Sequence, residues 1–289
     1  MEREAATRKK ILVVDDDPFI QSLVDGVLGQ QYELRVAANG HEALRAVEQE
    51  RPDLALCDVR MPGMDGLECL QRMTDQAPGL RVIMMTGETT ADTIASSLRH
   101  RAFDFLAKPF TMDQLRNLVS EALSYTGPEE FRVLSATPQW IEVETPCSLA
   151  SARRLFRFLS ELKAGLPPDT QTEIATAFRE LLQNAVEHGG KNDPTRHVHI
   201  CYLRLQSLVI YSIRDPGEGF RLEEIEHAAV ANPPDDPLRH IEFREKKKMR
   251  PGGFGLFITR QLVDEMIYNQ KRNEVLFVKY LSPDAKEKQ

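Results

Sequence analysis

The stretch Phe178–Gly190, FRELLQNAVEHGG, carries acidic and amide side chains at helical spacing. At about 100° per residue, four of the polar side chains in and just before this stretch fall within about 60° of one another: Glu173, Glu180, Asn184 and Glu187. An apolar stripe lies beside them, as in a helix that packs one face on a core. The stretch therefore predicts a helix with one packed face and one polar face.

The ends of this helix carry their own signals. The residues Pro-Pro-Asp at 167–169 stop the chain before it, and Thr170 and Glu173 have the spacing of a capping box. Gly189 supplies a C-terminal stop.

The polar face suits phosphoryl transfer. Asn184 offers a neutral oxygen that can bind Mg²⁺, and Glu180, one turn earlier, could accept the proton of a hydroxyl group. The alternative is an amphipathic helix with a solvated polar face.

Two glycine-rich boxes follow in the chain. The first, DPGEGF, begins at Asp215, whose carboxylate is an acceptor only and so suits the exocyclic amine of adenine. Its Gly217 and Gly219 allow close approach of the backbone to a ligand. The second box, PGGFGL, contains Gly253 and Gly255 and opens an apolar helix, whose free N–H groups suit a triphosphate.

The ordered set E-x-x-x-N, D-x-G-x-G and G-x-G resembles the GHKL ATPase superfamily. Within it, ELLQNAVEHGG, IRDPGEGF and GGFGLFITRQLVDEM look most like the bacterial anti-sigma-factor serine/threonine kinases, over roughly Gln139–Leu281. The resemblance implies ATP and Mg²⁺ as cofactors, and a STAS-type anti-sigma-factor antagonist as substrate. No histidine lies between Tyr125 and Phe178, which argues against a histidine kinase with its phosphoacceptor histidine there.

The first part of the chain alternates short apolar runs with helical patterns. This alternation predicts a doubly wound, flavodoxin-like parallel sheet of five strands. The expected strands are Ile11–Asp15, Glu33–Ala37, Leu54–Asp58, Val82–Thr86 and Phe103–Ala107.

Polar residues stand at the carboxyl ends of these strands, which is where such sheets place their functional groups. Asp15 and Asp16 supply a Mg²⁺ site with Asp58 beside it, so that Asp58 becomes a nucleophile towards phosphorus. Lys108 is a cation for the phosphoryl oxygens and Thr86 a hydroxyl that can turn towards them. The Lys108–Pro109 bond is expected to be cis, because the lysine must double back into the site.

These residues, with ILVVDDDP, LCDVRMPGMDG, MMTG and AKPF, resemble the receiver domain of two-component response regulators. The resemblance implies that Asp58 takes phosphate from an upstream histidine kinase, that Thr86 follows it inward, and that Phe105 switches rotamer. Phe105 replaces the tyrosine common there. The alternative for the acidic residues is a solvated loop.

The expected organisation is a receiver at residues 10–125, a linker and connecting strand at 126–138, and a GHKL (Bergerat) α/β sandwich at 139–282. In the last, a polar segment at 221–250 suits a lid over the nucleotide, or a solvated charged loop. The other expected elements there are a helix at Ser148–Leu162, antiparallel strands at His197–Leu205 and Leu208–Arg214, a helix at Phe254–Met266 and a strand at Glu274–Leu281.

Composition limits the remaining functions. The net charge is −7, and neither half carries the positive excess of a nucleic-acid binder. The sequence has no signal peptide and no apolar run long enough to span a membrane, so a cytoplasmic protein is expected. The four cysteines lack C-x-x-C spacing and are expected to be reduced core residues. His197 and His199 share one face of a strand, which suggests a metal pair that lacks a third ligand.

The leading hypothesis is a response regulator whose Asp58 controls an anti-sigma-type protein serine kinase. A second hypothesis is a module that binds ATP without catalysis and sequesters a sigma factor or an antagonist. An atypical histidine kinase is a third reading. A homodimer is compatible with the sequence, which leaves the oligomeric state open.

Overall fold

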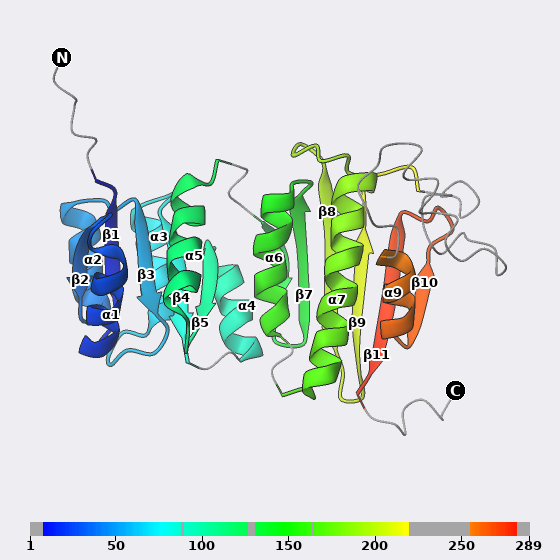
Figure 1. Cartoon of the computed structure of the whole chain (residues 1–289), viewed down its shortest axis with the longest axis horizontal. Helices are drawn as coiled ribbons and strands as arrows, with labels where there is room; N and C mark the ends of the chain where they lie inside the picture. The colour runs from blue at the N-terminus through cyan, green and yellow to red at the C-terminus, as the bar shows by residue number, and fades with distance from the viewer. Residues whose placement is uncertain (1–7, 88–89, 127–130, 163–164, 220–254, 282–289) are drawn as a thin grey trace, which may run out of the picture. The chain divides into compact units, whose positions relative to one another are not determined.

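The computed structural model describes residues 8–87, 90–126, 131–162, 165–219 and 255–281. The chain divides into two compact units, residues 1–129 and residues 130–289, and each has its own sheet (Figure 1). No helix within the described ranges has both the length and the apolar character needed to cross a membrane.

The first unit is built on a five-stranded sheet of order β2-β1-β3-β4-β5 (Figure 1). Every neighbouring pair of strands runs parallel, which confirms the predicted doubly wound sheet. Strand β3 is buried along its whole length, as expected for a parallel strand covered on both faces. The strands are β1 (Lys10–Val14), β2 (Glu33–Ala37), β3 (Leu54–Asp58), β4 (Arg81–Thr86) and β5 (Asp104–Ala107).

Five helices cover this sheet, and each begins at a side chain that accepts a hydrogen bond from the first turn. Helix α1 packs with α5, while α3 packs with both α2 and α4. The helices are α1 (Pro18–Leu28), α2 (Gly40–Gln49), α3 (Gly66–Gln76), α4 (Ala91–Arg99) and α5 (Met112–Ser124). Their capping residues are Asp17, Asn39, Asp65, Thr90 and Thr111.

The second unit has a six-stranded antiparallel sheet of order β10-β11-β9-β8-β7-β6. Its helices lie side by side on one face of the sheet (Figure 1), as in the predicted α/β sandwich. The strands are β6 (Arg132–Ala136), β7 (Trp140–Pro146), β8 (His197–Arg204), β9 (Leu208–Arg214), β10 (Glu265–Tyr268) and β11 (Glu274–Tyr280). The helices are α6 (Leu149–Glu161), α7 (Pro168–Asn184), the π-helical turn η1 (Ala185–Gly189) and α9 (Gly255–Leu262).

Aromatic side chains form the core between α7 and the sheet. The ring of Phe178 lies 4.9 Å from the ring of Tyr211, which in turn lies 5.0 Å from the ring of Phe277, measured between centroids. All three side chains are buried. On the opposite face of the sheet side chains are partly exposed, and Trp140 is 49% exposed. Buried and more exposed side chains alternate along β8 and β9 because helices cover only one face of the sheet.

The predicted start of the central helix is wrong. Helix α7 begins at Pro168, with Pro167 before it, and no side chain caps it. Proline is preorganised for the first helical turn, so the helix starts earlier than the Thr170 capping box would allow. Glu173 does not complete such a box and instead forms an ion pair with Lys279 at 2.6 Å.

The predicted helix Phe254–Met266 is also wrong at its C-terminal end. Helix α9 stops at Leu262, and Met266 and Ile267 belong to strand β10. Ile267 lies opposite Leu276 of β11 in an antiparallel pair. A short apolar run fits a helix or a strand equally well. Here residues 265–268 form a strand because they pair with β11.

Candidate functional site

Three carboxylates gather at the carboxyl ends of strands β1 and β3. Asp15 and Asp16 directly follow β1, and Asp58 is the last residue of β3. Because β1 and β3 are parallel neighbours, with Val14 opposite Cys57, these side chains meet at one edge of the sheet. One oxygen from each carboxylate lies within 4.8 Å of the others. Such a set of oxygen donors fits Mg²⁺.

Lys108 reaches into this cluster from the end of β5. Its Nζ donates to Asp15 Oδ2 at 2.7 Å and to Asp58 Oδ1 at 2.6 Å. The Lys108–Pro109 bond is cis, which confirms the expectation from the sequence. Thr86 is the buried last residue of β4, the strand next to β3, and Phe105 is buried within β5. The switch roles of Thr86 and Phe105 stay predictions.

Electrostatics at Asp58 follow from burial and from its neighbours. Burial raises the pKa of Asp58 above its usual value. The Lys108 ammonium and the Arg60 N–H, which donates to Asp58 Oδ2 at 3.0 Å, lower the pKa but do not cancel the rise. Burial lowers the pKa of Lys108, but its hydrogen bonds to Asp15 and Asp58 outweigh this, so the pKa of Lys108 is raised. Lys108 thus pairs with two of the three carboxylates, and this excess of negative charge favours binding of a further cation.

Gly66, the first residue of α3, supports this cluster from behind. A Cβ at Gly66 would lie 1.8 Å from the carbonyl oxygen of Asp58, and the Gly66 N–H donates to Val59 at 2.8 Å. Only glycine allows the helix to approach the strand end so closely. Gly66 is not among the site residues predicted from the sequence, although the glycine that ends MPGMDG could have signalled a close approach.

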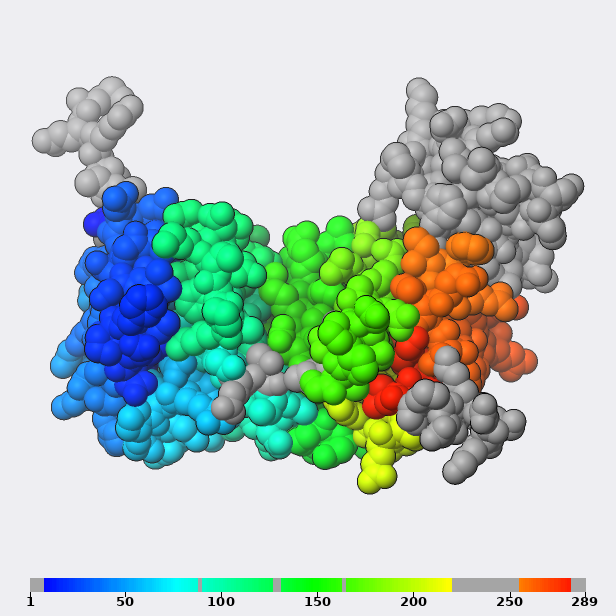
Figure 2. Space-filling model, turned by 60° about the horizontal axis from the view of Figure 1, so that its bottom comes forward, coloured from blue at the N-terminus to red at the C-terminus, as the bar shows by residue number. Residues whose placement is uncertain are grey.

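In the second unit, helix α9 begins directly against the polar face of α7. A Cβ at Gly255 would lie 2.5 Å from Glu180 Oε2 and 3.8 Å from Asn184 Nδ2. The two helices pack side by side in both whole-chain views (Figures 1 and 2). Glu180 and Asn184 are each half-buried. The structure therefore brings together three residues that the sequence assigns to one site.

Asp215 joins this arrangement from the end of β9. A Cβ at Gly189 would lie 2.2 Å from the carboxyl carbon of Asp215, so the first glycine box meets the end of the central helix. Asp215 Oδ1 accepts a hydrogen bond from the Gly217 N–H at 2.7 Å. Burial raises the pKa of Asp215, and the Gly217 N–H and the positive charges of Arg196 and Lys271 oppose the rise.

The helix changes its winding between Asn184 and Gly190. The turn η1 is π-helical, and the Gly190 N–H donates to the Ala185 carbonyl, five residues earlier, at 2.8 Å. A constant step of 100° therefore does not apply after Asn184, and the common face with Glu187 stays a prediction. Glu187 Oε1 accepts from Gln183 Nε2 at 2.8 Å. Such π-turns are frequent at functional sites.

Several predicted features lie outside the described residues. Gly253 of the second glycine box and the whole predicted lid, residues 221–250, are among them. Gly219 is described and has φ of +81°, in the region that favours glycine.

The proposed histidine metal pair gains no third ligand. His199 Nε2 lies 2.8 Å from Glu142 Oε1, and the carboxylates of Asp15, Asp16 and Asp58 are the one candidate metal group among the residues that the structure describes. All four cysteines are free, as expected, but Cys201 is only half-buried rather than part of the core.

A parallel sheet with a carboxylate–lysine cluster is followed by an antiparallel α/β sandwich in which Gly255 lies beside Glu180, and the two together define a signalling protein of two domains. Residues 11–120 match the response regulator receiver domain family, and residues 144–279 match the histidine kinase-like ATPase domain family. The chain belongs to the response regulator receiver family, and a kinase-like ATPase domain follows its receiver.

Known proteins resemble the receiver over its full length. The chain is 43% identical over 116 residues to sporulation initiation phosphotransferase F of Bacillus subtilis (strain 168), covering 40% of this chain and 94% of that protein. It is 40% identical over 121 residues to transcriptional regulatory protein ZraR of Klebsiella oxytoca, covering 42% of this chain but only 27% of that protein. The solved structure of chemotaxis protein CheY4 of Vibrio cholerae is 31% identical, covers 40% of this chain and 100% of that chain, and has a TM-score of 0.39.

Proposed function

We propose that this response regulator controls an ATP- and Mg²⁺-dependent protein serine kinase whose substrate is a STAS-type anti-sigma-factor antagonist. The meeting of Glu180 and Asn184 with Gly255 carries this proposal. A carboxylate oxygen of Glu180 and the side-chain amide of Asn184 lie there beside Gly255, the first residue of α9. No histidine lies at residues 126–177, which argues against a histidine kinase with its phosphoacceptor on a helix before the ATPase domain and favours transfer to another protein.

In the receiver, Asp58 is the nucleophile that accepts phosphate from an upstream histidine kinase. Asp15 and Asp16 would hold Mg²⁺ together with Asp58, and the metal supplies positive charge for the phosphoryl oxygens when bound. Lys108 already lies 2.6 Å from Asp58 and adds a fixed cation on the same side. Its raised pKa keeps this ammonium protonated at neutral pH.

In the kinase, Glu180 would accept the serine proton as the hydroxyl oxygen bonds to the γ-phosphorus of ATP and ADP leaves. Asn184 would hold Mg²⁺ through its amide oxygen, and Asp215 would accept a hydrogen bond from the adenine amine. Gly217 keeps the loop beside Asp215 free of a side chain, and a Cβ there would lie 2.7 Å from Asp215 Oδ1. The helix that starts at Gly255 offers its free N–H groups to the phosphates.

The direct test is incubation of the full chain with radiolabelled ATP, Mg²⁺ and STAS-type antagonists. We expect acid-stable label on a serine of the antagonist, and none on an antagonist whose acceptor serine is replaced by alanine. Acid-labile label on a histidine would instead indicate a histidine kinase. ATP-dependent binding of a sigma factor or antagonist without any label would identify a non-catalytic sequestering module.

Nucleotide selectivity tests the role of Asp215. We expect Asp215→Asn to weaken ATP binding about tenfold or more, because a hydrogen bond to a charged acceptor contributes about 1.5–3 kcal/mol and 1.4 kcal/mol corresponds to about tenfold. GTP affinity should not fall, since the carboxylate opposes the guanine carbonyl. Calorimetric titration measures both constants. Equal affinity of the unsubstituted protein for ATP and GTP would contradict the adenine role.

Regulation within one chain gives a further prediction. Thr86 and Phe105 are proposed to move inward when Asp58 is phosphorylated and so alter the surface of β5 and α5. A difference of about 1–3 kcal/mol in contact energy between the two states would change kinase activity about 5- to 150-fold. We expect a small phosphodonor to change antagonist phosphorylation by the full chain within this range. Full-length Asp58→Asn is the matched control, and an equal response in that variant would show that the receiver does not regulate the kinase.

A further inference from the structure

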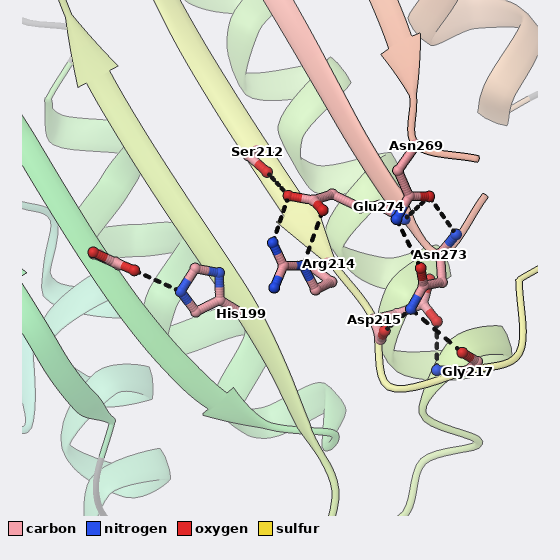
Figure 3. A network of polar contacts seen from close by, with 9 residues as sticks. His199, Ser212, Arg214, Asp215, Gly217, Asn269, Asn273 and Glu274 are labelled. Atoms are coloured by element: carbon pink, nitrogen blue, oxygen red, sulfur yellow. Dashed lines mark hydrogen bonds and ion pairs between the residues drawn. The ribbon is translucent and has the colours of Figure 1, made fainter. Parts of the chain in front are cut away.

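The turn between β10 and β11 lies against the loop that follows Asp215 (Figure 3). Asn273, at the end of this turn, contacts the loop three times. Its backbone carbonyl accepts from the Asp215 N–H at 2.8 Å, and its side-chain Nδ2 donates to the carbonyls of Asp215 at 3.0 Å and Gly217 at 3.4 Å. Asn273 thus hydrogen-bonds both the N–H and the C=O of Asp215, and also the C=O of Gly217.

The Asn273 side chain is itself held in one orientation. Asn269 Nδ2 donates to Asn273 Oδ1 at 2.9 Å. Asn269 Oδ1 in turn accepts from the backbone N–H groups of Asn273 at 3.1 Å and Glu274 at 3.2 Å. Both ends of the Asn273 amide are therefore used, so its two donor contacts to the loop have a fixed direction.

Gly219 shows independently that the loop rests on this turn. A Cβ at Gly219 would lie 1.7 Å from the carbonyl oxygen of Lys271. The backbone of the glycine box therefore lies against the backbone of the turn at a second point, two residues from Gly217.

We propose that Asn273 is a positioning residue for nucleotide recognition, which holds the Asp215 loop in place and thereby sets the preference for adenine over guanine. This inference rests on the proposed role of Asp215. A carboxylate discriminates between an amine and a carbonyl only where its direction is fixed, because a mobile carboxylate can turn away from an opposing carbonyl into water. The Gly217 N–H that aims the carboxylate lies within the backbone segment that Asn273 holds.

The test compares Asn273→Ala and Asn273→Asp in the full chain. Aspartate keeps the size and the acceptor for Asn269 but loses both donors to the loop. We expect each variant to bind ATP about tenfold more weakly, because the Asp215 and Gly217 carbonyls lose their donor and the loop is no longer held in one position. GTP binding should change less, so the ratio of ATP to GTP affinity falls. Gln270→Ala, which alters an exposed side chain in the same turn, should leave both affinities and the ratio unchanged.

A merely structural residue would produce another result. Equal loss of ATP and GTP affinity in folded Asn273 variants, or no loss of either, would overturn the positioning role while leaving ATP binding by the unsubstituted protein intact. Absence of ATP binding by the unsubstituted protein would instead overturn the proposed function. Thermal unfolding of each variant shows which proteins are folded. If Asn273→Ala does not fold, Asn273→Asp gives the ratio.

Discussion

We expect Asp58→Asn to abolish phosphorylation of this protein by a small phosphodonor such as acetyl phosphate. The carboxylate of Asp58 is where three acidic side chains and the Lys108 ammonium converge, with Lys108 Nζ at 2.6 Å. An amide in its place is neutral and a far poorer nucleophile towards phosphorus. Incorporation of label from the phosphodonor in the presence of Mg²⁺ measures the effect.

The same variant should remain folded. Burial raises the pKa of Asp58, so the ionised carboxylate is less stable in the folded protein than in the unfolded chain. Because the pKa of Asp58 is raised above 3.8 in the folded protein, the stability that this carboxyl group contributes is lost as the pH rises and the group ionises. An asparagine side chain does not ionise, so Asp58→Asn avoids this loss of stability at neutral pH. We therefore expect the unfolding temperature of Asp58→Asn to equal or exceed that of the unsubstituted protein.

Asp113→Asn is a matched control for this variant. Asp113 is an exposed aspartate on α5. Among the residues that the structure describes, its one ion pair is with Arg116 at the surface, at 3.0 Å. It should take up label normally. Label on Asp58→Asn at the stoichiometry of the unsubstituted protein would show that another residue accepts the phosphoryl group.

Glu180→Gln should lower the rate of antagonist phosphorylation about 10²- to 10⁴-fold, the usual effect of losing a general base. Glutamine keeps the shape of the side chain and much of its hydrogen bonding beside Gly255, so ATP affinity should change little. The measurement is a single-turnover rate with saturating ATP, together with calorimetric ATP binding.

Glu173→Gln provides the same chemical change on the same helix. Glu173 pairs with Lys279 at 2.6 Å instead of facing Gly255, so this variant should phosphorylate its antagonist at the normal rate. An unaltered rate in Glu180→Gln would assign proton transfer to a different group. Equal loss in both variants would indicate a general effect on α7.

Local patterns were sufficient to predict most of the fold. Parallel strands such as β3 are buried on both faces and read as continuous apolar runs, and each receiver helix begins at a capping side chain. Because parallel neighbours end at the same edge of the sheet, the meeting of Asp15, Asp16 and Asp58 could be foreseen from strand ends alone.

The errors arose where a pattern allowed two structures. Pro168 and Thr170 both mark helix starts, and the helix used the proline. Met266 and Ile267 fit a helical period, but pairing with β11 drew them into a strand. The winding change after Asn184 depends on where the Gly190 N–H finds its partner, which helical spacing cannot show.

The sequence by itself determined which residue types are available to the two sites, because nucleophile, base, amide and glycines stand in recognisable local motifs. Only the tertiary structure decided which of these residues touch and what holds them. Gly66 lies under Asp58, and Asn273 holds the Asp215 loop from 58 residues further along the chain. Such contacts join segments that are distant in sequence, and their geometry follows from how strands and helices pack. No local periodicity or spacing in the sequence therefore indicates them.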